Sequence, residues 1–76
     1  MAELPAVGSR ELQAAFRRAG WTGRRGKGHT VFSLGGRTVT IDDDRKRIPA
    51  GTLAAIRRKA GLDGDTFVAL LRGEWP

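Results

Sequence analysis

Hydrophobic residues recur at helical spacing in three stretches of the chain, and they alternate with polar residues between the first two of these stretches. In residues 9–19, apolar side chains return every three or four positions, which predicts a helix with one buried face. Ser9 is the predicted N-cap residue, and Gly20 is the predicted glycine that ends the helix. The apolar members of this face are Leu12, Ala15, Phe16 and Ala19.

The alternating stretch predicts an antiparallel hairpin. Residues 29–34 alternate with a period of two, and the Gly35-Gly36 pair that follows supplies the positive φ angles of a two-residue turn. Residues 37–41 are rich in β-branched side chains and predict the return strand. Residues 21–28, before the hairpin, form a basic, glycine-rich connection. The strand face expected to be buried carries Thr30, Phe32 and Leu34.

The second half of the chain predicts a loop followed by two helices. Residues 42–47 are all charged and have no apolar anchor, which indicates a solvated loop. Pro49 suits the first turn of a helix that ends at Gly61, and Asp63 suits the N-cap of a last, short helix. The predicted order is a helix, two strands with room for a third, and two helices. This order predicts an α+β fold with the helices on one sheet face. The expected buried residues of the later helices are Leu53, Ile56, Ala60, Phe67, Leu70 and Leu71.

Length and charge narrow the class of protein. At 76 residues we expect one domain, residues 9–72, between a flexible leader at 1–8 and a tail at 73–76, and no deep cofactor cleft. The net charge of +6 predicts polyanionic partners. The absence of cysteine excludes disulfide scaffolds and thiolate zinc sites, and fits a reducing cytoplasm. No stretch approaches the roughly 20 apolar residues that span a bilayer, and no signal peptide is evident, so we expect a cytoplasmic protein.

The single histidine, His29, is the candidate for proton transfer. RNA cleavage needs a group that takes the 2′-hydroxyl proton or protonates the leaving 5′-oxygen, and histidine is the side chain suited to this near neutral pH. Arg24, Arg25 and Lys27 lie just before it and could stabilise charge on the phosphoryl oxygens. The alternative is a half-exposed strand histidine without a catalytic role.

Clusters of basic residues favour nucleic acid over a merely solvated surface. The glycines among them would let a phosphate approach the backbone closely, although Gly26-Lys27-Gly28 matches no phosphate-binding motif and a flexible connection explains it equally well. The predicted RNA-binding residues are Arg24, Arg25, Lys27, Gly28, Arg37 and Lys46.

Two other sites are weaker interpretations of the sequence. Residues 42–44 are three aspartates that could bind magnesium, but the three basic residues after them more simply neutralise them. The last two predicted helices could form a helix-turn-helix, but Arg57 stands where that motif requires a small residue. We therefore expect no metal and no cofactor.

Several short motifs follow one another in a fixed order, from the histidine strand to the end of the second predicted helix. They are Gly28-His29-Thr30-Val31-Phe32, Val39-Thr40-Ile41, Ile48-Pro49-Ala50-Gly51-Thr52-Leu53-Ala54-Ala55-Ile56 and Ala60-Gly61-Leu62. With these motifs the chain resembles the HicA toxins over about residues 9–71.

The resemblance implies both a fold and an activity. The fold would be similar to the double-stranded RNA-binding domain, with a three-stranded antiparallel sheet whose first strand lies in residues 21–25, and helices packed on one face. The activity would be that of an mRNA interferase, a metal-independent endoribonuclease toxin that is inhibited by a HicB-like antitoxin covering its active site. His29 matches the active-site histidine of the family.

The chain departs from the family pattern at two places. Lys27-Gly28-His29 stands where the family usually has Gly-Ser-His, so a serine hydroxyl is absent. Asp42 and Asp44 stand in place of a proline and a histidine, and acidic groups there would repel phosphate unless residues 45–47 offset them. The alternative function is therefore a catalytically weakened or inactive module of the same fold that binds RNA or an antitoxin.

Overall fold

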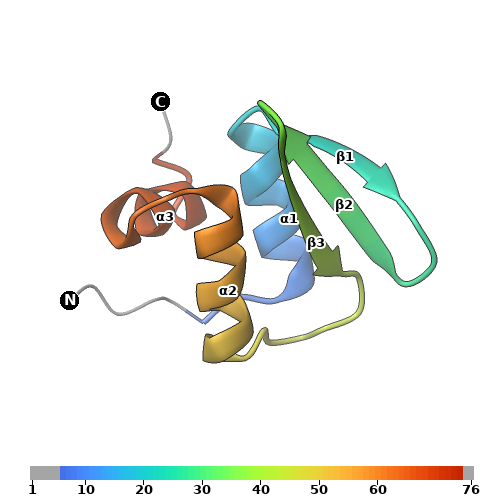
Figure 1. Ribbon diagram of the computed structural model, residues 1–76. Coiled ribbons are helices and arrows are strands. Elements are labelled where there is room, and N and C mark those ends of the chain that lie inside the picture. The colour runs from blue at the N-terminus through green and yellow to red at the C-terminus, as the bar shows by residue number, and fades with distance from the viewer. Residues whose placement is uncertain (1–5, 75–76) are drawn as a thin grey trace.

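The computed structural model describes residues 6–74, which form three helices and a three-stranded antiparallel sheet. The strands lie in the order β1-β2-β3, and the helices cover one face of the sheet (Figure 1). This confirms the predicted α+β fold and its likeness to the double-stranded RNA-binding domain. The elements are α1 (Ser9–Arg18), β1 (Thr22–Arg25), β2 (His29–Leu34), β3 (Arg37–Asp42), α2 (Ala50–Ala60) and α3 (Gly64–Leu71).

The alternation of β2 and β3 sends every second side chain into the core. Thr30 pairs with Ile41 and Phe32 pairs with Val39, and all four are buried beneath the helices. The φ angles of +56° and +82° at residues 35–36 confirm the predicted turn. Leu34, which the pattern assigned to the buried face, is 44% exposed because it is the last residue of β2, beside the turn.

Aromatic packing joins α1 to the sheet. The ring of Phe16 lies 5.0 Å from that of Trp21 in an edge-to-face arrangement and 5.7 Å from that of Phe32 in a stacked one. Gly23 of β1 makes room for this packing, since a Cβ atom there would lie 2.8 Å from the Phe32 ring. The other side chains of this core cluster are Leu12, Val39, Ile41, Ile48, Leu53, Ile56, Ala60 and Phe67.

The start of α1 differs from the prediction. The N-cap residue is Gly8, whereas Ser9 is the first helical residue, so the predicted cap was wrong by one position. Gly8 N donates to Glu11 Oε2 at 2.9 Å, and a Cβ atom on Gly8 would lie 2.5 Å from the carbonyl oxygen of Lys46. Only glycine fits so close to another backbone segment, and the Ser9 hydroxyl instead accepts a hydrogen bond from Arg45 N at 3.0 Å.

The ends of the described chain are attached to the fold. Val7 O accepts a hydrogen bond from Ile48 N at 2.8 Å, so this residue of the expected leader is tied to the segment before α2. Glu74 N of the expected tail donates to Ala69 O at 2.9 Å. Residues 1–5 and 75–76 of the leader and tail lie outside the described residues.

The predicted end of α2 and the predicted cap of α3 are confirmed, whereas Pro49 is the N-cap of α2 and so lies just before the first turn in which it was predicted. Gly61 ends α2 with a φ of +73°, and Asp63 Oδ1 accepts a hydrogen bond from Thr66 N at 2.7 Å at the start of α3. Arg57 donates to Leu62 O at 2.8 Å and so braces the turn between the two helices. Among residues 6–74, no helix is both long enough and apolar enough to span a bilayer.

We predict that the packing of α3 contributes a large part of the stability. Phe67 is 0% exposed, and Phe67→Ala should lower the free energy of unfolding by about 3–5 kcal/mol because it leaves a cavity in the core. Leu34→Ala, at an exposed position, should change it by less than about 0.5 kcal/mol. Urea unfolding followed by circular dichroism measures both, and equal effects of the two variants would contradict this packing.

Candidate functional site

His29 lies on the face of the sheet that the helices leave uncovered, here called the open face. It is the first residue of β2, it is half-buried, and it lies opposite Asp42 of β3 in the register. Its ring covers Gly26, where a Cβ atom would lie 2.8 Å from His29 Nε2. The backbone holds this arrangement, since Gly26 N donates to His29 O at 2.8 Å. The missing side chain at Gly26 is therefore what gives the imidazole its place.

The cations of the β1–β2 hairpin fall on both faces of the sheet. Arg24 pairs with Val31, and the strand alternation puts both on the open face with His29. Arg25 pairs with the buried Thr30, so it projects to the side of the helices. Lys27 and Gly28 form the exposed turn between the strands, with a φ of +74° at the glycine. The hairpin extends away from the helices (Figure 1).

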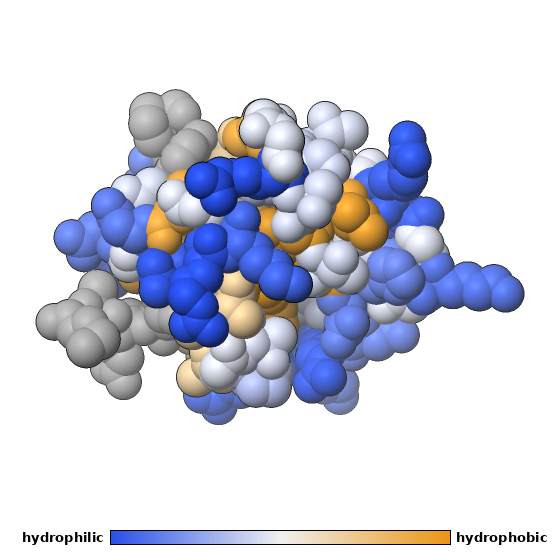
Figure 2. All heavy atoms as spheres, viewed as in Figure 1, coloured by the Kyte–Doolittle hydropathy of each residue, from blue (hydrophilic) through white to orange (hydrophobic). Residues whose placement is uncertain are grey.

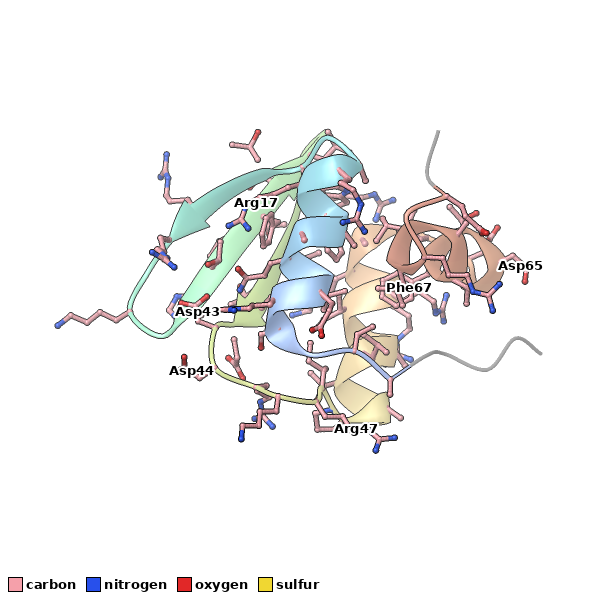
Figure 3. The ribbon with its side chains drawn as sticks, turned by 180° about the vertical axis from the view of Figure 1, so that it is seen from behind. Arg17, Asp43, Asp44, Arg47, Asp65 and Phe67 are labelled. Atoms are coloured by element: carbon pink, nitrogen blue, oxygen red, sulfur yellow. The ribbon has the colours of Figure 1, made fainter. Side chains whose placement is uncertain are left out.

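A carboxylate at the base of the hairpin binds two other elements. Asp43, directly after β3, accepts hydrogen bonds at Oδ1 from Gln13 Nε2 of α1 at 2.8 Å and from Thr30 Oγ1 of β2 at 2.9 Å. In Figure 3 Asp43 lies between α1 and the hairpin end of the sheet, while Asp44 lies farther along the loop. The Gln13 bond, then the Thr30 bond, lower the pKa of Asp43 below its ordinary value of 3.8, and the positive charge of Arg25 acts in the same direction.

A cavity of about 550 Å³ lies beside this carboxylate on the helix side of the sheet. The first turns of α1, the end of β1 and the loop after β3 form its walls. Its lining residues are Arg10, Glu11, Gln13, Arg25, Asp43, Asp44, Arg45 and Lys46.

The aspartates that depart from the family pattern have separate environments. Asp42 Oδ2 accepts a hydrogen bond from Arg45 Nε at 2.9 Å, and this ion pair confirms local neutralisation for that residue. Asp43 is bound internally, and Asp44 is exposed. Within residues 6–74, no group of three or more histidine, cysteine or acidic side chains is arranged to hold a metal ion.

The β1–β2 hairpin brings His29 together with Arg24, Lys27 and Gly28, whereas Arg25 and Lys46 line the cavity on the helix side and Arg37 lies apart from both groups. Arg37 pairs with Leu34 at the far end of β3, about 17 Å along the strand from Asp42. Its guanidinium lies against Gly61, where a Cβ atom would come 2.5 Å from Cζ. Lys46 lines the cavity rather than the open face. The roles of these residues stay predictions.

Sequence reasoning missed two residues of this region. Gln13 lies next to the apolar stripe of α1 and is itself buried, and a buried amide is a signal for an internal hydrogen-bond partner. Arg10 is an exposed residue of the first turn of α1, and no local pattern distinguishes it from other surface arginines.

The family comparison agrees with the motifs. A family model described as the HicA toxin of bacterial toxin-antitoxin matches residues 9–62, which is more than half of the chain. The matched range runs from the start of α1 to just beyond α2, and includes the whole sheet. Searches of curated proteins and of solved structures gave no match.

We predict that Asp43 makes stability depend on pH. Since its pKa is lowered in the folded state, its ionised form contributes stability above pH 3.8, and this contribution is lost as the pH falls through the folded pKa. Asp43→Asn should therefore lower Tm at pH 7. The difference in Tm between the variant and the parent should shrink as the pH falls below 3.8, the ordinary pKa of an aspartate. Thermal unfolding between pH 7 and pH 3, with Asp44→Asn as the control for charge, measures this.

A Tm difference for Asp43→Asn that is constant across this pH range would contradict the role of the ionised carboxylate. An equal difference in Asp44→Asn would show that only the net charge matters.

Proposed function

The chain belongs to the HicA toxin family of bacterial toxin-antitoxin systems, and we propose that it is an mRNA interferase, an endoribonuclease that cuts without a metal ion. The observation that carries this proposal is the position of His29. Its half-buried imidazole lies on the open face, within a protruding hairpin that carries Arg24 and Lys27. A proton-transfer group beside exposed cations is what cleavage of a phosphodiester requires.

The proposed step is a transfer of the phosphoryl group within the RNA. The imidazole takes the proton of a 2′-hydroxyl, and the 2′-oxygen forms a bond to the adjacent phosphorus while the bond from phosphorus to the 5′-oxygen breaks. The departing 5′-oxygen takes a proton from water, the imidazolium returns its proton to the solvent, and the products are a 2′,3′-cyclic phosphate and a 5′-hydroxyl. Arg24 and Lys27 would stabilise the charge that builds on the phosphoryl oxygens.

The same surface is the proposed binding site of a HicB-like antitoxin. The β1–β2 hairpin projects from the body of the domain, so a partner protein can cover its tip and the open face together. Hydrophilic side chains lie over the hairpin and over the region of α2 and α3, with hydrophobic atoms visible between them (Figure 2). Because the proposed substrate is mRNA, we place the protein in the cytoplasm.

A non-catalytic module that binds RNA or the antitoxin is the second candidate. Asp42 is the cross-strand neighbour of His29, and its charge opposes the approach of a phosphate. The ion pair with Arg45 at 2.9 Å offsets that charge, which favours the enzyme. The two candidates differ in whether His29 is needed for more than binding.

We predict that His29→Ala removes cleavage and leaves the fold intact. A labelled single-stranded RNA incubated with the parent in EDTA should be cut, and the variant should cut it at least about 100-fold more slowly, which is the usual size of a general acid–base contribution. Ser33→Ala, on the same face farther along β2, is the matched control and should cut like the parent.

Two results would contradict this prediction. Equal cleavage by His29→Ala and the parent would place the chemistry elsewhere. Binding of the RNA by the parent without any cleavage would favour the non-catalytic module.

We also predict that Gly26→Ala disturbs the active geometry. The added methyl group would lie 2.8 Å from the imidazole, so the ring must move, although the φ angle at this position is not positive. Cleavage should fall while RNA binding is retained. Gly51→Ala in α2, where the new Cβ would meet no atom of another element within 4 Å, should leave cleavage unchanged. Parental cleavage rates in Gly26→Ala would show that the position of the ring is not critical.

A further inference from the structure

We propose that the cavity beside Asp43 is a second phosphate-binding site for the RNA backbone, on the opposite side of the sheet from His29. This inference rests on the proposed RNA substrate and adds to it a path for the strand. The RNA would pass around the edge of β1, with one phosphate at the open face and a neighbouring part of the backbone in the cavity. The observations that support it are the charges of the cavity and its connection to the hairpin.

Three cations that line the cavity have no ion-pair partner within the described residues. Within residues 6–74, the one ion pair shorter than 4.0 Å is that of Asp42 and Arg45. The other three cations of the lining, Arg10, Arg25 and Lys46, therefore face the cavity without a carboxylate at that distance. Like charges held around one concavity repel one another, and an anionic ligand removes that repulsion.

The basic side chains of the lining, Arg10, Arg25, Arg45 and Lys46, outnumber its carboxylates, Glu11, Asp43 and Asp44, by one. Glu11 accepts a hydrogen bond from Gly8 N at 2.9 Å, and Asp43 accepts two from Gln13 and Thr30, so both are held against the fold while they keep their negative charge. Asp44 is exposed at the rim and makes none of these bonds, so its charge can be removed without loosening the fold. Each of the three carboxylates should weaken the binding of an anion, and the proposal depends on the net excess of cations.

The placement of the cations favours a nucleic acid backbone over an acidic protein segment. Arg24 and Arg25 are successive residues of an edge strand and project to opposite faces, and Lys27 lies at the tip of the same hairpin. The positive charge therefore continues around the edge of the sheet from the open face to the cavity. A polymer with a charge on every repeat can contact such a series at several points, and arginine suits the geometry of phosphate.

The test uses RNA that cannot be cut. A fluorescent single-stranded RNA with 2′-O-methyl groups lacks the attacking hydroxyl, so binding to the full chain can be followed by anisotropy over a range of salt concentrations. The variant Arg10→Gln with Lys46→Gln removes two cavity cations without touching the open face. The matched control is Arg58→Gln with Lys59→Gln, which makes the same change of net charge on exposed residues at the end of α2.

The expected result is weaker binding by the cavity variant alone. The slope of log affinity against log salt should become shallower by about 0.7 for each lost phosphate contact, and the control should keep the parental slope. Asp44→Asn should bind more tightly than the parent, because the repelling carboxylate at the rim is gone.

Two results would overturn the inference, and they differ in what else they affect. If the parent binds the RNA and the cavity variant binds it equally well, or no worse than the control, the cavity is not an RNA site, and an acidic segment of a protein partner becomes the better occupant. If the parent does not bind the RNA even at low salt, the proposed function fails together with this inference.

Discussion

The region around the hairpin depends on the carboxylate of Asp43, which joins three elements through one oxygen atom. This oxygen accepts hydrogen bonds from Gln13 of α1 at 2.8 Å and from Thr30 of β2 at 2.9 Å, and the residue itself directly follows β3. Its backbone N donates to Gly28 O at 2.9 Å, which extends the attachment to the turn of the hairpin. Because bonds to an ionised carboxylate are stronger than neutral ones, this end of the sheet is held against α1.

The hydrogen bond from Thr30 to Asp43 fixes which face of the sheet the residues beside Thr30 occupy. Since successive residues of a strand point to opposite faces, a buried Thr30 sends His29 to the open face. The pairing of Thr30 with Arg25 likewise directs that arginine to the helix side, and Arg24 to the side of the histidine. The positions of His29, the proposed proton-transfer group, and of the cavity on opposite faces thus follow from one buried hydroxyl and its partner.

Local sequence signals predicted the elements, whereas contacts between distant segments determined the site. The glycine turn between β2 and β3 and the aspartate cap of α3 depend on a few neighbouring residues, and they were confirmed. The buried stripes of the helices were confirmed except at Ala19 and Leu71, which are only partly buried. By contrast, the N-cap of α1 is Gly8 and not the predicted Ser9. This difference depends on the close approach of the Lys46 carbonyl oxygen, which is far away in the sequence. The bond between Gln13 and Asp43 spans 30 residues, so charge patterning alone described that aspartate only as part of a solvated loop.

The most direct measurement is a map of backbone amide shifts in the ¹⁵N-labelled full chain on addition of the 2′-O-methyl RNA. A binding surface centred on the hairpin predicts the largest shifts in residues 24–29 and in the loop of residues 43–46, with α3 unchanged. Shifts concentrated in α3 and the last turn of α2, with the hairpin unaffected, would contradict the assignment of His29 and its surrounding cations to the RNA site.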